Sequence, residues 1–256
     1  MTDTGKIVAI IPARYASTRL PGKPLIDLCG KPMIQHIYER TAQAKLVDFV
    51  IVATDDIRIM EAVENFGGRS ILTPTDIPSG SDRIAFASKE LEGISIVVNV
   101  QGDEPLIASQ MIDEAVMPLI QDKEISVSTL VKKILSADEL KNPNIPKAVI
   151  DRFGYAMYFS RSPIPYLRDR QNIDEWYLYH DYYKHIGLYV YRKEVLNKFT
   201  TWGESLLERI EKLEQLRMLE NGIRIKTVVT KYDTIPVDTI EDVGKVRLLI
   251  EKSQRS

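Results

Sequence analysis

A short loop near the start of the chain gathers cations. Residues 12–24 read PARYASTRLPGKP, in which Arg14, Arg19 and Lys23 stand among small and turn-forming residues. Such a loop exposes backbone N–H groups, and guanidinium or ammonium groups add charge-assisted hydrogen bonds to an anion. The pattern predicts a polyphosphate site, although a solvated basic turn has the same composition. The sequence contains neither G-x-G-x-x-G nor G-x-x-x-x-G-K-[ST], so it lacks the usual fingerprints of dinucleotide-binding and P-loop proteins.

A second group of candidate side chains follows an apolar run at residues 96–100. The sequence continues QGDEP, where Gly102 permits close approach of the backbone to a ligand and two carboxylates follow. Mg²⁺ prefers one or two carboxylates together with phosphate oxygens. We therefore expect Asp103 to hold Mg²⁺ beside the basic loop. Asp238, in the segment PVDT, is the second candidate ligand, with helix capping as its alternative role.

Other chemically capable residues give weaker signals. The turn PSGSDR at 78–83 leads into a helical pattern whose first amides could hold an anion or a base edge. A single histidine such as His185 is more often structural than catalytic. Glu208, Glu211 and Glu214 recur every three residues, which predicts a solvated acidic helix face.

These side chains need a scaffold that brings distant loops together. Apolar runs at 7–11, 49–53 and 96–100 are short and followed by polar residues, as buried parallel strands are when their carboxyl ends carry a site. Between them, helical patterns at 34–41 and 59–66 each place apolar residues on one face. Alternating strands and helices predict an α/β fold.

The second half of the chain is less regular. Expected strands lie at 126–131, 147–150, 155–159, 186–191 and 224–230. One helix is predicted by an apolar stripe that ends before Gly222, formed by Leu206, Ile210, Leu213 and Leu216. Thr239 and Asp242 resemble a capping box that opens a last helix. The aromatic segment 172–184 predicts an arm or a subunit contact.

The composition excludes several classes of protein. The chain has 256 residues, with 34 Lys and Arg against 36 Asp and Glu, so bulk charge does not hold it to nucleic acid or anionic lipid. One cysteine excludes an internal disulfide. No apolar stretch approaches the roughly 18 residues of a membrane span, and the first residues lack a signal-peptide pattern. We expect a cytoplasmic protein.

Eight segments together resemble one enzyme family. In chain order they are IIPARYASTRLPGKPL, VATDD, PSGSDR, NVQGDEP, GYAMYFSRSPIPY, KHIGLYVYR, LEQLRMLENG and PVDTIEDV. The chain is similar to the bacterial 3-deoxy-manno-octulosonate (Kdo) cytidylyltransferases, a branch of the sugar nucleotidyltransferases. The resemblance implies Mg²⁺-dependent transfer of CMP from CTP to the anomeric hydroxyl of Kdo for lipopolysaccharide synthesis, with release of pyrophosphate. It also implies a Rossmann-like nucleotidyltransferase fold, with a mixed, mostly parallel sheet flanked by helices, in a homodimer.

The resemblance further implies roles for individual residues. The catalytic set would be Arg14, Lys23, Asp103 and Asp238, with the two aspartates as metal ligands. CTP would contact Ala13, Arg14, Ser17, Arg19, Lys23, Ser81, Arg83 and Gln101. The sugar acid would contact Gln101, Arg161, His185, Tyr189, Glu214 and Gln215, with Arg161 pairing with its carboxylate.

The expected organisation is a single nucleotidyltransferase domain over residues 1–256. It would contain a CTP-binding half at about 1–130, an inserted sugar-binding and dimerisation lobe at about 131–235, and a metal-ligand turn with the last helix at 236–256.

Two alternative functions stay open. One is the same transfer to 8-amino-Kdo or sialic acid, and the other is a CTP-binding relative without catalysis. Attack on the α-phosphate needs cations to stabilise the developing charge, and it needs no nucleophilic side chain.

Overall fold

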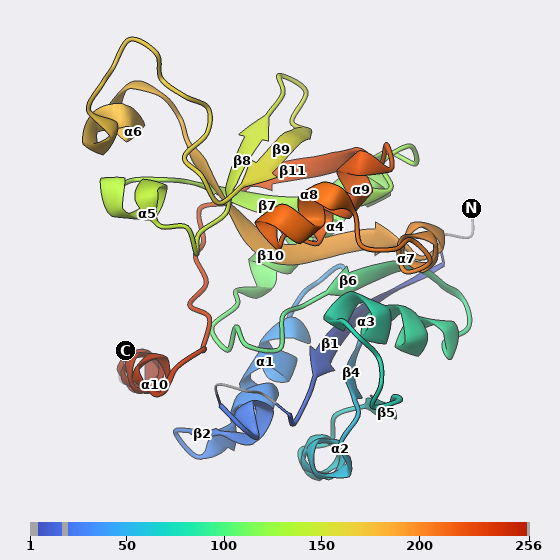
Figure 1. Cartoon of the computed structure of the whole chain (residues 1–256). Coiled ribbons are helices and arrows are strands. Elements are labelled where there is room, and N and C mark those ends of the chain that lie inside the picture. Colours follow the sequence, from blue (N-terminus) through green and yellow to red (C-terminus); the bar gives the residue numbers. More distant parts are fainter. Residues whose placement is uncertain (1–4, 17–19, 255–256) are drawn as a thin grey trace.

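The computed structural model describes residues 5–16 and 20–254 of the chain, and Figure 1 shows how their elements are arranged. The strands are β1 (Lys6–Ala13), β2 (Asp27–Leu28), β3 (Lys31–Pro32), β4 (Phe49–Thr54), β5 (Ser70–Leu72), β6 (Ile94–Asn99), β7 (Val127–Lys133), β8 (Lys147–Ile150), β9 (Ala156–Ser160), β10 (Tyr183–Arg192) and β11 (Ile225–Val229). The helices are α1 (Met33–Thr41), α2 (Ile57–Asn65), α3 (Gly80–Lys89), α4 (Ser109–Gln121), α5 (Ala137–Lys141), α6 (Trp176–Tyr179), α7 (Lys193–Phe199), α8 (Leu206–Glu211), α9 (Gln215–Glu220) and α10 (Ile240–Gln254), with 3-10 turns η1 (Lys23–Leu25) and η2 (Ile173–Glu175).

The main sheet joins both halves of the chain. Its strand order is β11-β7-β10-β6-β1-β4-β5, with β8 and β9 attached beside β10. Neighbours in this row run parallel, except that β10 is antiparallel to both β6 and β7. The predicted α/β class and the mixed, mostly parallel sheet are therefore confirmed.

Helices cover the two faces of the sheet around separate apolar cores. In β1, Ala9 and Ile11 point into the core that α1, α2, α4 and α10 complete. The alternate residues Val8 and Ile10 point into the core on the other face, under α3, α7 and α9. This double burial explains why the run at 7–11 is continuously apolar rather than alternating.

The ends of β1 and β6 lie close together at the edge that carries the loops. Val100 N–H donates to the carbonyl of Ile10 at 3.2 Å. At Gly102, a Cβ atom would lie 2.3 Å from the carbonyl oxygen of Pro12, so any other residue would clash there. This tight crossing sets Asp103 beside the basic loop that follows β1.

The prediction of a single helix that begins near Leu206 and ends before Gly222 is wrong, because the chain forms two short helices, α8 and α9. α8 ends at Glu211, and the next residue, Lys212, has a left-handed backbone with φ of 52°. Leu213 and Leu216 are buried, whereas Leu206 and Ile210 are exposed. The left-handed residue reverses the chain, and the reversal presents the start of α9 to the end of the sheet.

The last helix begins with the predicted capping box. Thr239 N–H donates to Asp242 Oδ2 at 3.1 Å, and Asp242 N–H donates to Thr239 Oγ1 at 3.3 Å. These two side chains cap α10, so the carboxylate of Asp238 is not needed for that purpose. Between β11 and α10, an extended strap crosses the molecule (Figure 1).

The aromatic segment forms an arm with its own small core. Trp176 and Tyr182 pack with Ile134 and Leu140. α5 and α6 project from one side of the sheet (Figure 1), and Leu178 remains exposed on this arm. Within residues 5–16 and 20–254, no helix combines the length and apolar character needed to cross a membrane.

Candidate active site

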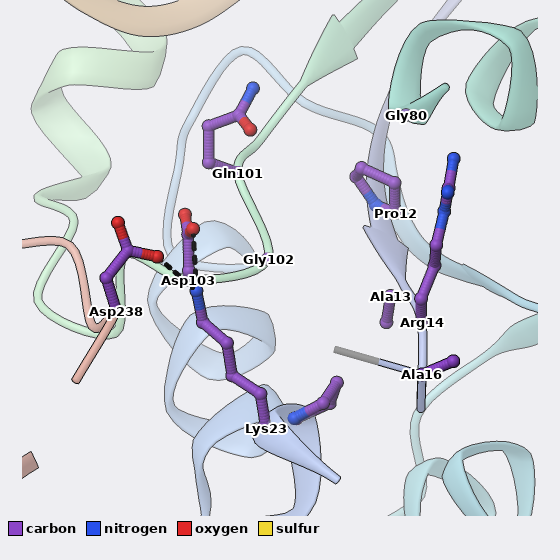
Figure 2. A pocket seen from close by; sticks show the side chains of 11 residues that line it. Pro12, Ala13, Arg14, Ala16, Lys23, Gly80, Gln101, Gly102, Asp103 and Asp238 are labelled. Atoms are coloured by element: carbon purple, nitrogen blue, oxygen red, sulfur yellow. Dashed lines mark hydrogen bonds and ion pairs between the residues drawn. The ribbon is translucent and has the colours of Figure 1, made fainter. Parts of the chain in front are cut away.

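A cavity of about 390 Å³ opens where the loops after β1 and β6 meet (Figure 2). Its lining includes six residues that were predicted to act on the nucleotide or the metal: Ala13, Arg14, Lys23, Gln101, Asp103 and Asp238. Loops from residues 12 to 16, 22 to 24 and 101 to 103, together with the strap at 238, thus converge on one site. We call it the charged cavity.

The two predicted metal ligands lie on either side of one ammonium group. Lys23 Nζ donates to Asp103 Oδ2 at 2.9 Å and to Asp238 Oδ1 at 3.1 Å (Figure 2). About a third of each carboxylate side chain is exposed, at 34% and 37%. Backbone pairing holds the two aspartates together, because the N–H of buried Val237 donates to the carbonyl of Asp103 at 2.9 Å.

The donor set fits a divalent cation that is completed by a substrate. The two partly exposed carboxylates are negatively charged and therefore attract a cation. They supply oxygen ligands, which Mg²⁺ prefers. In the part of the chain that the structure describes, no three or more His, Cys, Asp or Glu side chains gather as a complete metal site. Phosphate oxygens and water are the other ligands that Mg²⁺ commonly takes.

The neighbouring carboxylate, Glu104, faces the protein interior. Its Oε1 accepts a hydrogen bond from Thr234 Oγ1 at 3.1 Å. Burial, with a smaller effect from the charge of Asp103, raises the pKa of Glu104 to about 8. Of the two carboxylates in QGDEP, only Asp103 lines the cavity.

Cationic groups lie on the opposite wall of the charged cavity. Figure 2 shows Arg14 extending alongside Gly80, the first residue of α3. Ser79 caps this helix by accepting from Asp82 N–H at 3.1 Å. The guanidinium and the positive end of the helix dipole together favour an anion. Ser17 and Arg19, predicted for the same role, lie outside the described residues.

Arg83 occupies a different place from the one expected. Its side chain is fully buried, and it donates to Asp55 Oδ2 at 2.8 Å and to the hydroxyl of Thr73. Arg83 lines neither the charged cavity nor the cavity described next. The hydrogen bonds of its guanidinium therefore connect α3 to the loops after β4 and β5, inside the fold.

A second cavity of about 210 Å³ adjoins the first, and Gln101 lines both. Its lining includes the predicted sugar-binding residues Gln101, His185, Tyr189, Glu214 and Gln215, and also Ser81, which was expected at the nucleotide. Gln101 is held at the junction because its Nε2 donates to the carbonyl of Gly187 at 2.9 Å. We call this second space the neutral cavity.

Most polar groups of the neutral cavity are uncharged. Burial lowers the pKa of His185 to about 3, so its ring is neutral at physiological pH. The His185 Nε2 atom lies 3.0 Å from Thr129 Oγ1. Gln215 is 6% exposed, yet its Nε2 atom has no hydrogen-bond partner among the described residues. A buried polar atom without a partner leaves a donor for a hydroxylated ligand.

The predicted solvated acidic face is wrong, because each of its three glutamates has a partner. Glu208 is buried and accepts two hydrogen bonds from Arg217, at 2.8 and 2.5 Å. Glu211 accepts from the Ser160 hydroxyl at 2.6 Å. Glu214 lines the neutral cavity and accepts from the Ser81 hydroxyl at 2.7 Å, and burial raises the pKa of Glu214.

Arg161, expected to pair with a sugar carboxylate, is engaged elsewhere. Its guanidinium donates to three backbone carbonyls: Glu211 at 2.7 Å, Pro143 at 2.9 Å and Lys212 at 3.2 Å. It lines neither cavity. These carbonyls lie at the end of α8 and in a loop, where helix or sheet bonding does not satisfy them. The structure thus gives Arg161 a role in holding the turn that leads to Glu214.

Sequence reasoning missed several residues of the neutral cavity. They include Asn99, Gly187, Tyr191, Phe199 and Met218. The sequence pattern could have identified Tyr191. Every second residue of a strand lies on the same face, and His185, Gly187, Tyr189 and Tyr191 are spaced in this way along β10. The rings of Tyr189 and Tyr191 stack with centroids 5.7 Å apart.

Comparisons with known proteins agree with the geometry. A family model described as cytidylyltransferase matches residues 8–225. The chain is 52% identical to the 3-deoxy-manno-octulosonate cytidylyltransferase of Geobacter metallireducens over 98% of each chain. It is 53% identical to that of Geotalea uraniireducens, over 96% of this chain and 100% of the relative.

A solved structure extends the likeness to three dimensions. A CMP:2-keto-3-deoxy-manno-octonic acid synthetase complexed with CTP matches with a TM-score of 0.90 and 44% identity, over 97% of this chain and 99% of that one. The predicted nucleotidyltransferase fold is therefore confirmed. The chain belongs to the cytidylyltransferase family, among its 3-deoxy-manno-octulosonate cytidylyltransferases.

Proposed function

We propose that the chain transfers CMP from CTP to the anomeric hydroxyl of Kdo and releases pyrophosphate, with Mg²⁺ held by Asp103 and Asp238. The observation that carries this proposal is the junction of two unlike cavities at Gln101. One cavity offers cations and carboxylates to a metal-bound triphosphate, and the other offers neutral polar groups to a sugar. Adjacent binding would place the sugar hydroxyl within reach of the α-phosphate.

The charged cavity would hold the triphosphate. Arg14 and Lys23 would bind its oxygens, supported by the N-terminus of α3 and the backbone at Ala13. Ser17 and Arg19 belong to the same proposed set by their place in the loop. A bound Mg²⁺ would neutralise charge that develops on the phosphate oxygens.

The neutral cavity would hold the hydroxyl groups of the sugar. Gln101, His185, Tyr189 and Gln215 can exchange hydrogen bonds with them, and Glu214 can accept from a hydroxyl. No Lys or Arg of the described chain lines this cavity. We therefore propose that the sugar carboxylate points out of it, toward Arg14 and Lys23 in the charged cavity, and does not depend on Arg161.

The organisation of the protein is part of the proposal. Residues 1–130 would form most of the CTP-binding half, residues 131–235 the lobe with the sugar cavity and the arm, and residues 236–256 the metal-ligand turn with the last helix.

The exposed Tyr166 and Leu178 suit the arm to a homodimer contact. Light scattering should give twice the chain mass of 29.2 kDa, and a monomer would contradict the dimer. Because CTP is a cytoplasmic nucleotide, a cytoplasmic location accompanies the reaction.

Pyrophosphate release tests the reaction itself. Purified protein is incubated with Mg²⁺, each of the four nucleoside triphosphates, and Kdo, 8-amino-Kdo or sialic acid. We expect release with CTP and Kdo. Release only with another sugar acid would overturn the proposed acceptor but keep the chemistry, whereas CTP binding without any release would favour a non-catalytic relative.

A further inference from the structure

Lys23 lies where the proposed metal ion would have to bind. Its Nζ contacts Asp103 Oδ2 at 2.9 Å and Asp238 Oδ1 at 3.1 Å, so one ammonium bridges the two carboxylates (Figure 2). A divalent cation needs the same oxygen atoms. The ammonium and the metal ion therefore compete for them.

Short-range contacts hold these three side chains near one another. Lys23 follows Gly22, whose φ of 69° is left-handed, and the turn is closed by Lys23 N–H donating to the carbonyl of Leu20 at 3.1 Å. Asp103 and Asp238 are tied through the hydrogen bond from Val237 to the Asp103 carbonyl. The carboxylates cannot easily separate, and without a cation between them they would repel each other.

The backbone anchors leave the Lys23 side chain as the adjustable part. It is 14% exposed and lines the charged cavity together with Arg14, so an entering triphosphate would offer it new oxygen acceptors. A lysine side chain is a flexible four-carbon stem that ends in an ammonium group. It lacks the rigid, planar donor geometry of arginine, so it can exchange one hydrogen-bond acceptor for another.

We propose that Lys23 is an internal counter-cation of the metal site. In the free enzyme it holds the two carboxylates and hinders divalent-cation binding, and it moves to the phosphate oxygens when the nucleotide enters. This inference rests on the proposed function, because it takes Asp103 and Asp238 as the metal ligands.

A coupling between nucleotide and metal follows from this exchange. A triphosphate that draws Lys23 away removes the competing ammonium from both carboxylates, and a metal ion that displaces Lys23 makes the lysine available to phosphate. Each ligand thereby favours the other, and the coupling free energy is reciprocal. The free enzyme would then bind a divalent cation weakly until the nucleotide arrives.

Binding of Mn²⁺ without nucleotide tests the proposal. Free Mn²⁺ is followed by electron paramagnetic resonance during titration of the wild type and of Lys23→Gln, which removes the charge at similar size. We expect Lys23→Gln to bind Mn²⁺ about tenfold more tightly than the wild type. A tenfold change is at the low end of the effect expected when hydrogen bonds between charged groups no longer compete with the metal ion. Adding Asp103→Asn to Lys23→Gln should abolish the gain and so locate it.

Arg14→Gln is the matched control. It removes one positive charge from the same cavity, yet Arg14 forms no ion pair with Asp103 or Asp238 among the described contacts. We expect a much smaller change in Mn²⁺ affinity. An equal gain in Arg14→Gln and Lys23→Gln would overturn the proposal, because a general electrostatic field would then explain both.

Other outcomes separate the inference from the metal site. If Lys23→Gln binds Mn²⁺ no more tightly than the wild type while Asp103→Asn abolishes binding, the counter-cation role is wrong and the metal site stands. If Asp103→Asn has no effect in either background, the proposed metal site is itself wrong. A wild-type crystal structure with Mn²⁺ removes any dependence on variant folding. Lys23 should have left both carboxylates, and Mn²⁺ bound with Lys23 still in place would contradict the proposal.

Discussion

The charged cavity is lined by Arg14, Lys23 and two carboxylates, whereas the neutral cavity beside it is lined mainly by aromatic rings and uncharged polar groups. The difference matches the proposed assignment of the substrates. A triphosphate with a metal ion would be recognised by charge, while sugar hydroxyls would be recognised by directional hydrogen bonds in a partly dry space. Gln101 belongs to both linings, so in the proposed assignment the two substrates would meet there.

Local placement of charge also explains how a slightly acidic protein can bring two anions together. The whole chain has a formal net charge of −2. Cations within a few ångströms of the phosphates act far more strongly than distant surface charges, which salt screens beyond about 10 Å. Recognition in the charged cavity should therefore be sensitive to single substitutions.

Removing a carboxylate from the charged cavity should have the largest effect. We expect Asp103→Asn to lower kcat by about a hundredfold to a thousandfold, because losing this ligand weakens the hold on the metal ion that would stabilise the charge developing on the phosphate. Pyrophosphate release gives the rate. Asp169→Asn, an exposed change on the arm, is the control and should leave kcat unchanged. Near wild-type turnover in Asp103→Asn would remove the charged cavity from the chemistry.

A change in the neutral cavity should act on the sugar alone. We expect Gln215→Leu to raise KM for Kdo about tenfold, as loss of one hydrogen bond in a closed site does, and to leave KM for CTP unchanged. Its melting temperature should not fall, because the Nε2 atom lost has no partner in the described residues. A rise in KM for CTP instead would mean that the two cavities are not separate binding sites.

The neutral His185 predicts a smaller, pH-dependent effect on stability. Its pKa of about 3 in the folded chain lies below the value of about 6.5 for an unfolded histidine. Between these values the unfolded chain binds more protons, so stability is lost as pH falls below about 6.5. We expect the melting temperature of His185→Gln to drop about 3 °C less than that of the wild type between pH 7 and pH 5.

His180→Gln, on the exposed arm, provides the comparison for that pH experiment. It removes an imidazole that does not line the neutral cavity. If His185→Gln follows the wild-type curve, the ring of His185 is accessible to protons in the folded chain, and the second cavity is less neutral than described.

The sequence predicted the charged cavity better than the neutral one, for a physical reason. Parallel strands meet at their carboxyl ends, so loops after 7–11 and 96–100 could be brought together from periodicity alone. The neutral cavity combines β10 with α9, and the break between α8 and α9 depends on a left-handed Lys212 that propensity does not predict. Without that break, Glu214 looked like part of a solvated face.

The partners of the predicted arginines could not be read from the sequence. Arg83 and Arg161 stand in motifs that resemble a substrate site, yet in the structure one pairs with Asp55 inside the fold and the other donates to backbone carbonyls. A sequence shows that a guanidinium is present, but its partners depend on which acceptors the fold leaves unsatisfied. Arg14 differs because no fold-internal acceptor claims it among the described hydrogen bonds, and it lines the cavity.

A crystal structure with CTP and a Kdo analogue that lacks the anomeric hydroxyl tests the central claim most directly. We expect the triphosphate beside Arg14 and Lys23, the sugar hydroxyls among Tyr189, Glu214 and Gln215, and the anomeric carbon next to Gln101. A sugar bound outside the neutral cavity, with its carboxylate on Arg161, would contradict this assignment of the two cavities.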